Sequence, residues 1–400
     1  MTNDAATVPL RGPIAPPATI GMLGGGQLGK YALMAANAMG YRTLVLDPDP
    51  SAPSGVVAND HLVAAYDDPA SLRRLTIDCD VITTEFENPP AAALATLAGS
   101  TQVAPRPSSV GIAQDRVAEK EFLLDNGFPV GRHVVLDDAI PIADDVLDEV
   151  ADGGAIVKTA RLGYDGKGQR RVTGRAEALA AWAELGGVVC VVEELLDLRC
   201  EVSVLVARTS DGRVDTWPVA ENVHVDGILD VSIVPARIDP VLADRAVGLA
   251  MALADALDYV GVLAVEMFVV GDESGADTIL VNEIAPRPHN SGHWTLDVSV
   301  TSQFEQQIRA VCGLGLGDSS MTAPAAAMVN VLGDMWFDEP SDIAVEPDWA
   351  VVLDEPAATL HLYGKTEPRR ARKMGHITVS APTPDLAARK ALALRTAAAH

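Results

Sequence analysis

Two short stretches decide the fold: LAVEMF at 263–268 and LVNEI at 280–284. Each is an apolar run typical of a strand, with a single carboxylate inside it. The segment between them, GDESGAD at 271–277, has the composition of a turn. Residues paired in a hairpin have numbers with a constant sum, and the midpoint of Glu266 and Glu283 falls inside this turn. We therefore expect these two glutamates to be neighbours on one face of a hairpin.

Glu266 and Glu283 require a partner for their charge. Like charges directly opposite each other destabilise a sheet, and burying carboxylates costs still more. A divalent cation removes both costs, and oxygen ligands favour Mg²⁺, with Mn²⁺ as a second possibility. The alternative is a solvated face that points away from the core. Asn282 can be a third ligand only if a twist or bulge turns it to the same face.

The composition limits the classes of protein that fit. The chain has 400 residues, enough for two to four domains of roughly 100–200 residues each, and a net charge of −25. Such a charge repels phosphates, so we expect no nucleic acid partner. The four cysteines show no CxxC spacing, which indicates thiols in a reducing compartment. Because we find no signal peptide and no apolar run of about 20 residues, we expect a cytoplasmic protein without a membrane partner.

The pattern of apolar segments predicts an N-terminal βαβ half-sheet after a flexible tail at residues 1–17. Its expected elements are the strand Thr19–Leu23, the helix Gln27–Met39 and the strands Arg42–Leu46 and Val81–Glu87. Ligands of such sheets bind beyond the carboxyl ends of the strands, where Asp47 and Glu85 fall. A second unit begins near Asp115, with strands expected at 155–159, 188–193, 202–207, 262–270 and 278–284 and helices at 176–185 and 240–257. The mixed remainder ends in a helix expected at 387–399.

The glycine turn GGGQLG at 24–29 matches the dinucleotide fingerprint GxGxxG between a strand and a helix. Asp47 ends the next strand, near the offset expected for a residue that binds the ribose. An NAD-dependent dehydrogenase is therefore one alternative. A plain strand-to-helix turn is the other, because such a turn shows only that a ligand can approach a helix N-terminus.

A second glycine-rich loop, GYDGKGQ at 163–169, follows an apolar run that ends in Lys158. Backbone N–H groups of such a loop can surround phosphates, although the GK[ST] ending of a Walker A loop is absent. The alternatives are an ordinary hairpin turn and an edge-strand charge at Lys158. Further on, backbone groups at 193–196 can bind a purine base and the carboxylate of Glu201 a ribose diol, unless the strand merely leaves its sheet here.

These features occur in the order and spacing of the ATP-grasp superfamily, which the chain resembles. Longer motifs are similar to the bacterial 5-(carboxyamino)imidazole ribonucleotide synthases of purine biosynthesis, over about residues 18–380. The motifs are GGGQLG at 24–29, TTEFEN at 83–88, GYDGKGQ at 163–169, ENVHVDGI at 221–228, NEIAPRPHNSGHWT at 282–295 and LYGKTEPRRARKMGHI at 362–377. Ala371 is a departure, because this family usually has glycine there.

The resemblance implies an α/β and α+β multidomain fold. A Rossmann-like pre-ATP-grasp βαβ domain is expected at 18–114, the ATP-grasp domain with its lid at 115–310 and a small mixed domain at 311–400. The implied reaction joins bicarbonate to the amine of 5-aminoimidazole ribonucleotide and splits ATP to ADP and phosphate. A homodimer is also implied.

The resemblance assigns residues to three parts of one site. The magnesium ligands are Glu266 and Glu283. The nucleotide contacts are Arg116, Lys158, Gly163, Tyr164, Asp165, Gly166, Lys167, Gly168, Gln169, Glu193, Glu194, Leu195, Leu196, Glu201, His224, Asn282 and Glu283. The ribonucleotide contacts are Gln27, Glu85, Tyr164, Asp165, Arg287, His289 and Asn290, with Lys365, Arg372 and Lys373 at its phosphate.

In the implied mechanism, bicarbonate attacks the γ-phosphorus of ATP and forms carboxyphosphate. Magnesium, Lys158 and Arg116 neutralise the charge on the phosphates, and the glycine-rich loop closes to exclude water. Carboxyphosphate, or CO₂ released from it, then carboxylates the amine. We expect Arg287 to orient the intermediate. Asp165, His289 and the released phosphate are alternative acceptors of the amine proton.

The densest basic cluster of this acidic chain supports an anionic ligand. It consists of Lys365, Arg369, Arg370, Arg372 and Lys373. A solvated basic face is the alternative. Two relatives inside the superfamily, a formate-dependent glycinamide ribonucleotide transformylase and a biotin carboxylase, are disfavoured by Gln27 and the stretch NSGHWT. A non-catalytic acidic scaffold is the last alternative.

Overall fold

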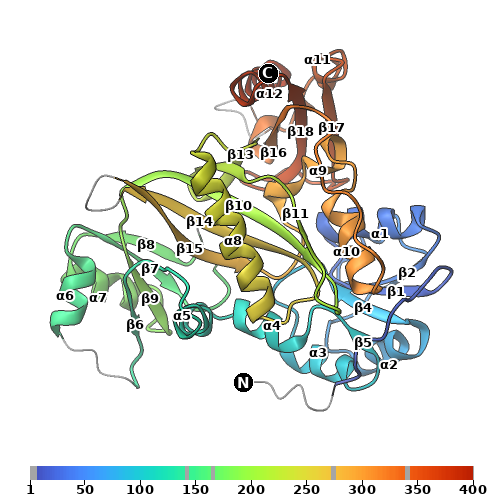
Figure 1. Ribbon diagram of the computed structural model, residues 1–400, viewed down its shortest axis with the longest axis horizontal. Helices are drawn as coiled ribbons and strands as arrows, with labels where there is room; N and C mark the ends of the chain where they lie inside the picture. The colour runs from blue at the N-terminus through green and yellow to red at the C-terminus, as the bar shows by residue number, and fades with distance from the viewer. Residues whose placement is uncertain (1–6, 140–143, 164–166, 272–275, 338–342, 400) are drawn as a thin grey trace.

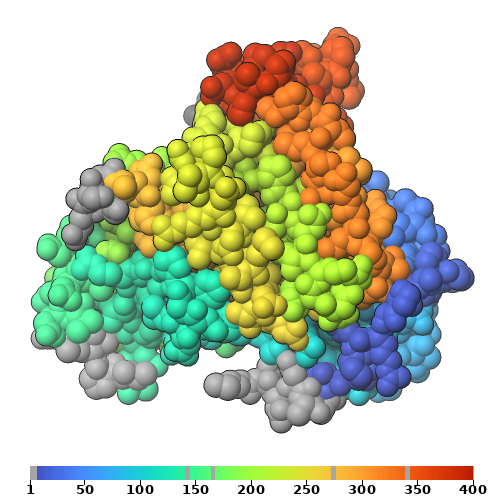
Figure 2. Space-filling view, in the orientation of Figure 1, coloured from blue at the N-terminus to red at the C-terminus, as the bar shows by residue number. Residues whose placement is uncertain are grey.

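The computed structural model describes residues 7–139, 144–163, 167–271, 276–337 and 343–399. Within these ranges the chain forms three β-sheets with helices packed around them (Figure 1). The predicted class, an α/β and α+β multidomain fold, is confirmed. Figure 2 shows the C-terminal part standing out from the rest of the molecule. None of the helices in the described ranges is long and apolar enough to span a bilayer.

The N-terminal sheet is parallel, with the strand order β3-β2-β1-β4-β5. Its elements are β1 (Thr19–Leu23), α1 (Gln27–Ala38), β2 (Arg42–Leu46), β3 (Asp60–Leu62), α2 (Pro69–Asp78), β4 (Val81–Thr84), α3 (Ala91–Ala98), β5 (Gln102–Val103) and α4 (Pro107–Ala113). The bounds predicted for β1 and β2 are confirmed. The bounds predicted for the strand at 81–87 are wrong, because it ends at Thr84, whose hydroxyl donates to Phe86 O and turns the chain at Glu85.

A second, antiparallel sheet has the order β6-β9-β7-β8. Its elements are β6 (His133–Leu136), α6 (Asp144–Ala151), β7 (Ala155–Thr159), β8 (Gln169–Val172), α7 (Arg175–Glu184) and β9 (Cys190–Glu194). Apolar side chains of both helices pack against this sheet. Because β7 lies between β8 and β9, Lys158 is not on an edge strand, and that alternative is wrong. The glycine-rich loop joins β7 to β8.

The largest sheet has the order β15-β14-β10-β12-β13-β16-β18-β17, with β11 paired to β10. Its strands are β10 (Leu198–Arg208), β11 (Val214–Thr216), β12 (Ala220–Val225), β13 (Ile228–Val234), β14 (Gly261–Gly271), β15 (Asp277–Ala285), β16 (Ala325–Leu332), β17 (Ala358–Leu362) and β18 (Lys373–Ala381). The helix α8 (Pro240–Ala256) buries Ala246, Ala250 and Leu253 in the core formed with β10 and β14. β14 and β15 form the predicted hairpin, and β15 is an edge strand.

This sheet continues across the boundary expected at residue 310. β13 pairs with β16, with Val231 opposite Val329. The C-terminal helices are α11 (Trp349–Leu353) and α12 (Pro384–Ala398), and Arg395 of α12 forms an ion pair with Asp230 of β13 (Nη2–Oδ2 3.0 Å). The C-terminal part is therefore joined to the preceding unit by backbone pairing as well as by side chains.

Residues 7–17, which we expected to belong to a flexible tail, pack against the body of the protein. The N–H of Val8 donates to Ala98 O, and the N–H of Ile14 donates to Cys312 O (2.7 and 2.8 Å). Leu10 and Ile14 contact the core that α1 shares with α10 (Gln303–Val311). The sequence prediction considered only the Pro/Ala-rich composition, not the apolar side chains within it.

A cluster of aromatic and histidine side chains joins the three parts of the chain. It consists of Tyr31 of α1, His293 and Asp297 at the start of α9 (Thr295–Val298), and His361, Tyr363 and His376 of the β17–β18 pair. His293 and His376 are fully buried. Burial lowers the pKa of both imidazoles well below the usual range, and the neighbouring His361 adds to this effect.

We predict that acid destabilises the protein through His293 and His376. The folded protein keeps both imidazoles neutral, whereas the unfolded chain binds their protons below about pH 6.5. Their contribution to stability is therefore complete above that pH and is lost as the pH falls, by up to about 1.4 kcal/mol per histidine and pH unit. Urea unfolding at a series of pH values from about 7.5 to 5 measures this slope.

His376→Gln is the test variant. His133→Gln is its matched control, because His133 lies on β6, outside the cluster. The slope should decrease in His376→Gln and remain in His133→Gln. An unchanged slope in His376→Gln would show that the acid sensitivity comes from other groups.

Candidate functional site

Residues from the two antiparallel sheets and from the segments that follow β1 and β4 of the N-terminal sheet line a cavity of about 1150 Å³. With the exception of Gly168, every site residue predicted from the sequence and present in the described ranges lines this cavity. Gly168 lies at the base of the glycine-rich loop, where its carbonyl oxygen accepts a hydrogen bond from Thr159 N (2.9 Å). The predicted contacts Tyr164, Asp165 and Gly166 lie outside the described residues.

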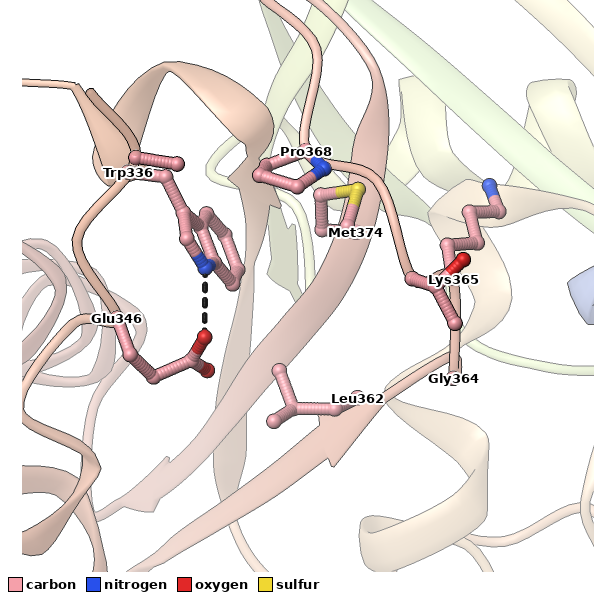
Figure 3. A pocket seen from close by; sticks show the side chains of 9 residues that line it. Trp336, Glu346, Leu362, Gly364, Lys365, Pro368 and Met374 are labelled. Atoms are coloured by element: carbon pink, nitrogen blue, oxygen red, sulfur yellow. Dashed lines mark hydrogen bonds between the residues drawn. The ribbon is translucent and has the colours of Figure 1, made fainter.

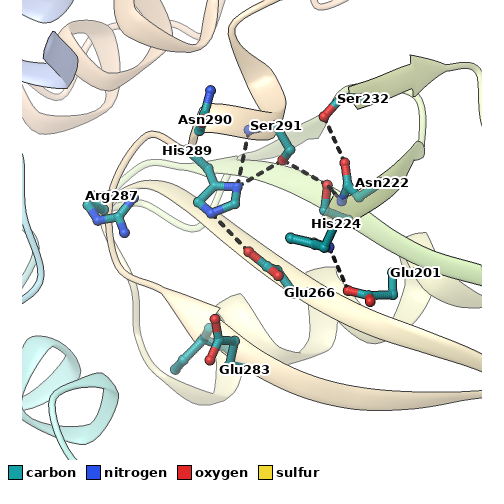
Figure 4. Close-up of polar contacts among 12 residues, drawn as sticks. Glu201, Asn222, His224, Ser232, Glu266, Glu283, Arg287, His289, Asn290 and Ser291 are labelled. Carbon is teal, nitrogen blue, oxygen red and sulfur yellow. Dashed lines mark hydrogen bonds and ion pairs between the residues drawn. The ribbon is translucent and has the colours of Figure 1, made fainter. Parts of the chain in front are cut away.

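Glu266 and Glu283 are paired directly across β14 and β15, as predicted (Figure 4). The next pair is Met267 with Val281, so Asn282 is the extra residue of a β-bulge. The Oδ1 atom of Asn282 is buried and has no hydrogen-bond partner. Two carboxylates and an unpartnered amide oxygen are a donor set that fits Mg²⁺. The bulge that Asn282 requires to act as a ligand is thus present.

Basic side chains surround this donor set. Arg116, the first residue of α5 (Arg116–Asp125), donates from Nη1 to Glu283 Oε2 at 2.7 Å. Lys158 and Lys120 both form ion pairs with Glu193 on β9. Burial alone would raise the pKa of Glu193, but the two lysines outweigh burial and lower the pKa to about 2. Glu193 therefore stays ionised and holds both ammonium groups, of which that of Lys158 belongs to a residue of the cavity wall.

His289 lies against Glu266, with its Nε2 atom 2.9 Å from Oε1 (Figure 4). Its Nδ1 atom lies 2.8 Å from Ser291 Oγ. Ser291 begins a buried hydrogen-bond chain that the sequence analysis did not predict, which continues through Ser203, Asn222 and Ser232. Both imidazole nitrogens thus have partners that fix the orientation of the ring. Only the pairing of distant strands brings these side chains together.

Two further predicted residues are held by carboxylates. Arg287 forms an ion pair with Glu87 (Nη2–Oε2 2.5 Å), a residue that the sequence analysis quoted in a motif but did not assign. His224 Nδ1 lies 2.9 Å from Glu201 Oε2, which brings two predicted nucleotide contacts together. The pair of Glu87 and Arg287 spans the N-terminal sheet and the segment after β15, so the sequence offers no local signal for it.

The N-terminus of α1 is already occupied by the Glu85 carboxylate. This carboxylate accepts hydrogen bonds from Gly26 N (2.8 Å) and Gly29 N (3.0 Å). The carboxylate of Asp47 likewise accepts hydrogen bonds, from Gly25 N (2.6 Å) and from the Tyr66 hydroxyl (2.7 Å). A pyrophosphate would need these N–H groups, so the dehydrogenase alternative is rejected.

Three family models match the chain. They describe a ribonucleotide synthetase preATP-grasp domain at residues 17–114, an ATP-grasp domain at 121–304 and a phosphoribosylaminoimidazole carboxylase C-terminal domain at 326–390. The N5-carboxyaminoimidazole ribonucleotide synthase of Brucella melitensis is 44% identical over 367 residues, which cover 91% of this chain and 97% of that protein. The chain belongs to the N5-carboxyaminoimidazole ribonucleotide synthase family. The family predicted from the motifs is confirmed.

Solved structures of N5-carboxyaminoimidazole ribonucleotide synthases have the same fold. An ADP complex has a TM-score of 0.85 and 38% identity and covers 95% of this chain and 97% of its own. The Aspergillus clavatus enzyme in complex with ADP and 5-aminoimidazole ribonucleotide has a TM-score of 0.82 and 28% identity, covering 95% and 98% of the two chains.

The basic end of the cavity meets the N-terminal sheet. Lys365 donates from Nζ to Gln27 Oε1 (3.0 Å) and to Lys373 O (2.7 Å). Arg372 lines the same cavity. Residues from opposite ends of the sequence thus form one wall, which the resemblance to N5-carboxyaminoimidazole ribonucleotide synthases led us to expect.

A smaller cavity of about 410 Å³ lies beside the Lys365 loop and is lined by residues that include Trp336, Glu346, Leu362 and Met374 (Figure 3). The Trp336 indole donates to Glu346 Oε2 (2.8 Å). Lys365 lines this cavity too, but its ammonium group points to Gln27. The charge of Lys365 therefore serves the large cavity.

Asp297, His361 and His376 are a second group of possible metal ligands among the described residues, with ligand atoms within 4.8 Å of one another. However, the two imidazoles stack, with centroids 4.5 Å apart and an angle of 17° between the planes. Lone pairs in parallel ring planes run side by side and do not meet at one point. We therefore assign this group a packing role.

Ala371, where the N5-carboxyaminoimidazole ribonucleotide synthase family usually has glycine, has a φ of 64°. This left-handed conformation strains any residue with a Cβ atom. We predict that Ala371→Gly raises the free energy of unfolding by about 1 kcal/mol. Ala393→Gly, on the exposed side of α12, should lower it by about as much, because glycine weakens a helix interior. Urea unfolding of both variants distinguishes relief of strain from a general effect of glycine.

Proposed function

We propose that the chain carboxylates 5-aminoimidazole ribonucleotide with bicarbonate, at the expense of ATP, and so forms N5-carboxyaminoimidazole ribonucleotide in purine biosynthesis. The observation that carries this proposal is that one cavity contains both a carboxylate pair suited to a nucleotide-bound metal and a basic wall suited to a ribonucleotide phosphate. The family supports it, because relatives carry this name and one solved structure holds ADP and 5-aminoimidazole ribonucleotide.

At the nucleotide end, Glu266, Glu283 and Asn282 would hold Mg²⁺, with Mn²⁺ as a substitute. When bound, the ion would supply positive charge that neutralises the phosphates of ATP. Lys158 and Arg116 add positive charge at the same phosphates, and the glycine-rich loop 163–169 excludes water from the intermediate. Strand β9 with Glu193–Leu196 binds the adenine, and the pair of Glu201 and His224 binds the ribose.

At the other end, Lys365, Arg372 and Lys373 bind the ribonucleotide phosphate, while Gln27, Glu85, Asn290 and the loop residues Tyr164 and Asp165 place its aminoimidazole ring. Bicarbonate oxygen attacks the γ-phosphorus and ADP leaves. The amine then attacks the carbon of the resulting carboxyphosphate, or of CO₂ released from it, and phosphate leaves. Arg287, held by Glu87, orients the anionic intermediate, and Asp165, His289 or the departing phosphate takes the proton of the amine.

We further propose that the chain has domains at 18–114, 115–310 and 311–400, that the protein forms a homodimer and that it resides in the cytoplasm. Four cysteine thiols without a disulfide bond are consistent with a reducing compartment.

The test is the release of ADP from ATP with Mg²⁺ and bicarbonate, measured with and without 5-aminoimidazole ribonucleotide. We expect the ribonucleotide to stimulate ADP release and a carboxylated product to appear. ADP release that is insensitive to the ribonucleotide would contradict the substrate, and no ADP release under any condition would contradict the ATP-dependent reaction itself.

Glu283→Gln should lower kcat by about 100-fold or more, because the variant loses a charge that holds the metal and pairs with Arg116. Glu184→Gln, at an exposed position of α7, is the matched control and should keep wild-type activity. Comparable activity of Glu283→Gln and Glu184→Gln would exclude Glu283 as a metal ligand.

A further inference from the structure

The backbone around the Asn282 bulge lies on an edge of the largest sheet, where its outer side meets another extended segment at Val281, in an isolated bridge with Val130, and the following residues 282–284 continue beyond that bridge. A bulge disturbs the ladder further, because Asn282 has no paired residue on β14. Some other part of the chain must therefore hold residues 282–284 in place. The helix α5 lies against β15 and does so.

Three residues of α5 contact three consecutive residues of β15. Arg116, Glu119 and Lys120 share one face of the helix, since they are three and four positions apart. Lys120 donates from Nζ to Asn282 O (2.9 Å), Arg116 donates to the Glu283 carboxylate (2.7 Å), and Glu119 accepts from Ile284 N (2.6 Å). The contacts of Glu119 and Lys120 are with the backbone, so they fix the path of the strand on both sides of Glu283.

Glu119 and Lys120 are almost fully buried, with exposed fractions of 2% and 4%. Charged residues are rarely buried to this degree unless they have specific partners. Lys120 also lies 3.2 Å from Glu193 Oε1 on β9. It therefore connects the bulge on the largest sheet with the strand that carries the proposed adenine contacts on the second sheet.

We propose that Glu119 and Lys120 are positioning residues, which hold the β15 bulge in the geometry that turns Asn282 and Glu283 to the metal and fix that bulge relative to β9. Neither residue has to touch a substrate or the metal. The inference rests on the proposed function, since it assigns these residues to the metal site of that function. Residues that orient metal ligands typically change metal affinity by about 10–100-fold when they are replaced.

The variants Lys120→Met and Glu119→Leu remove the contacts with little change in volume, and Glu119→Gln keeps an acceptor for Ile284 N. Glu121→Leu is the matched control, because Glu121 is the neighbouring residue on the exposed face of α5. The measurement is the Mg²⁺ concentration that gives half-maximal ADP release, together with KM for 5-aminoimidazole ribonucleotide. The affinity for Mn²⁺ in the presence of ADP, followed by electron paramagnetic resonance, is a readout that needs no turnover.

Lys120→Met and Glu119→Leu should raise the half-maximal Mg²⁺ concentration and the Mn²⁺ dissociation constant by about tenfold or more. KM for the ribonucleotide should change less than about twofold, and Glu119→Gln and Glu121→Leu should resemble the wild type. A purely structural role would instead lower the unfolding temperature while leaving the metal affinity of the folded enzyme unchanged, which would overturn the proposal.

If Lys120→Met and Glu119→Leu fail to fold, the decision falls to Lys120→Arg, which keeps the side-chain charge. A Lys120→Arg enzyme with wild-type metal affinity and wild-type KM for ATP would then overturn the proposal, because the longer guanidinium cannot keep both short contacts. If the wild type releases no ADP but binds Mn²⁺, the proposed function fails while the Mn²⁺ titration still decides the positioning role.

Discussion

The charge of two glutamates that face each other across β14 and β15 constrains the structure around them. Glu266 and Glu283 are directly opposite, where two like charges destabilise a sheet. The surroundings offset this repulsion, since Arg116 pairs with Glu283 and His289 with Glu266. Those partners come from α5 and from the segment after β15. The carboxylate pair therefore determines which parts of the chain must converge on the hairpin.

The cavity is assembled from parts that are far apart in the sequence and are joined by a few polar contacts. Gln27 meets Lys365, and Glu87 meets Arg287. The buried cluster around His293 and His376 lies at the same junction of the three parts. Because burial lowers the pKa of these imidazoles and keeps them neutral, they add contact area between the parts without adding charge to the junction. Packing at the junction thus holds the parts of the chain that line the cavity against one another.

Local patterns in the sequence were sufficient to predict most strands and the hairpin. Runs of apolar residues, glycine-rich turns and the pairing of residues about the midpoint of a turn all depend on residues that are close together in the sequence. Of the site residues assigned through the motifs of the family, all those in the described ranges except Gly168 line the cavity. Three features could not be found in this way. The contacts of Glu119 and Lys120 and the pair of Glu87 with Arg287 depend on tertiary packing, and so does the packing of residues 7–17 against the core formed by α1 and α10. The dinucleotide fingerprint was misleading, because Glu85 occupies the helix N-terminus that the motif describes.

The most direct test of this account is anomalous diffraction from crystals grown with ADP and Mn²⁺. The account predicts a manganese peak between the carboxylates of Glu266 and Glu283, at about 2.1 Å from their oxygens, with Asn282 Oδ1 directed toward it. A peak at another position, such as the group of Asp297, His361 and His376, with none between the two glutamates, would contradict it.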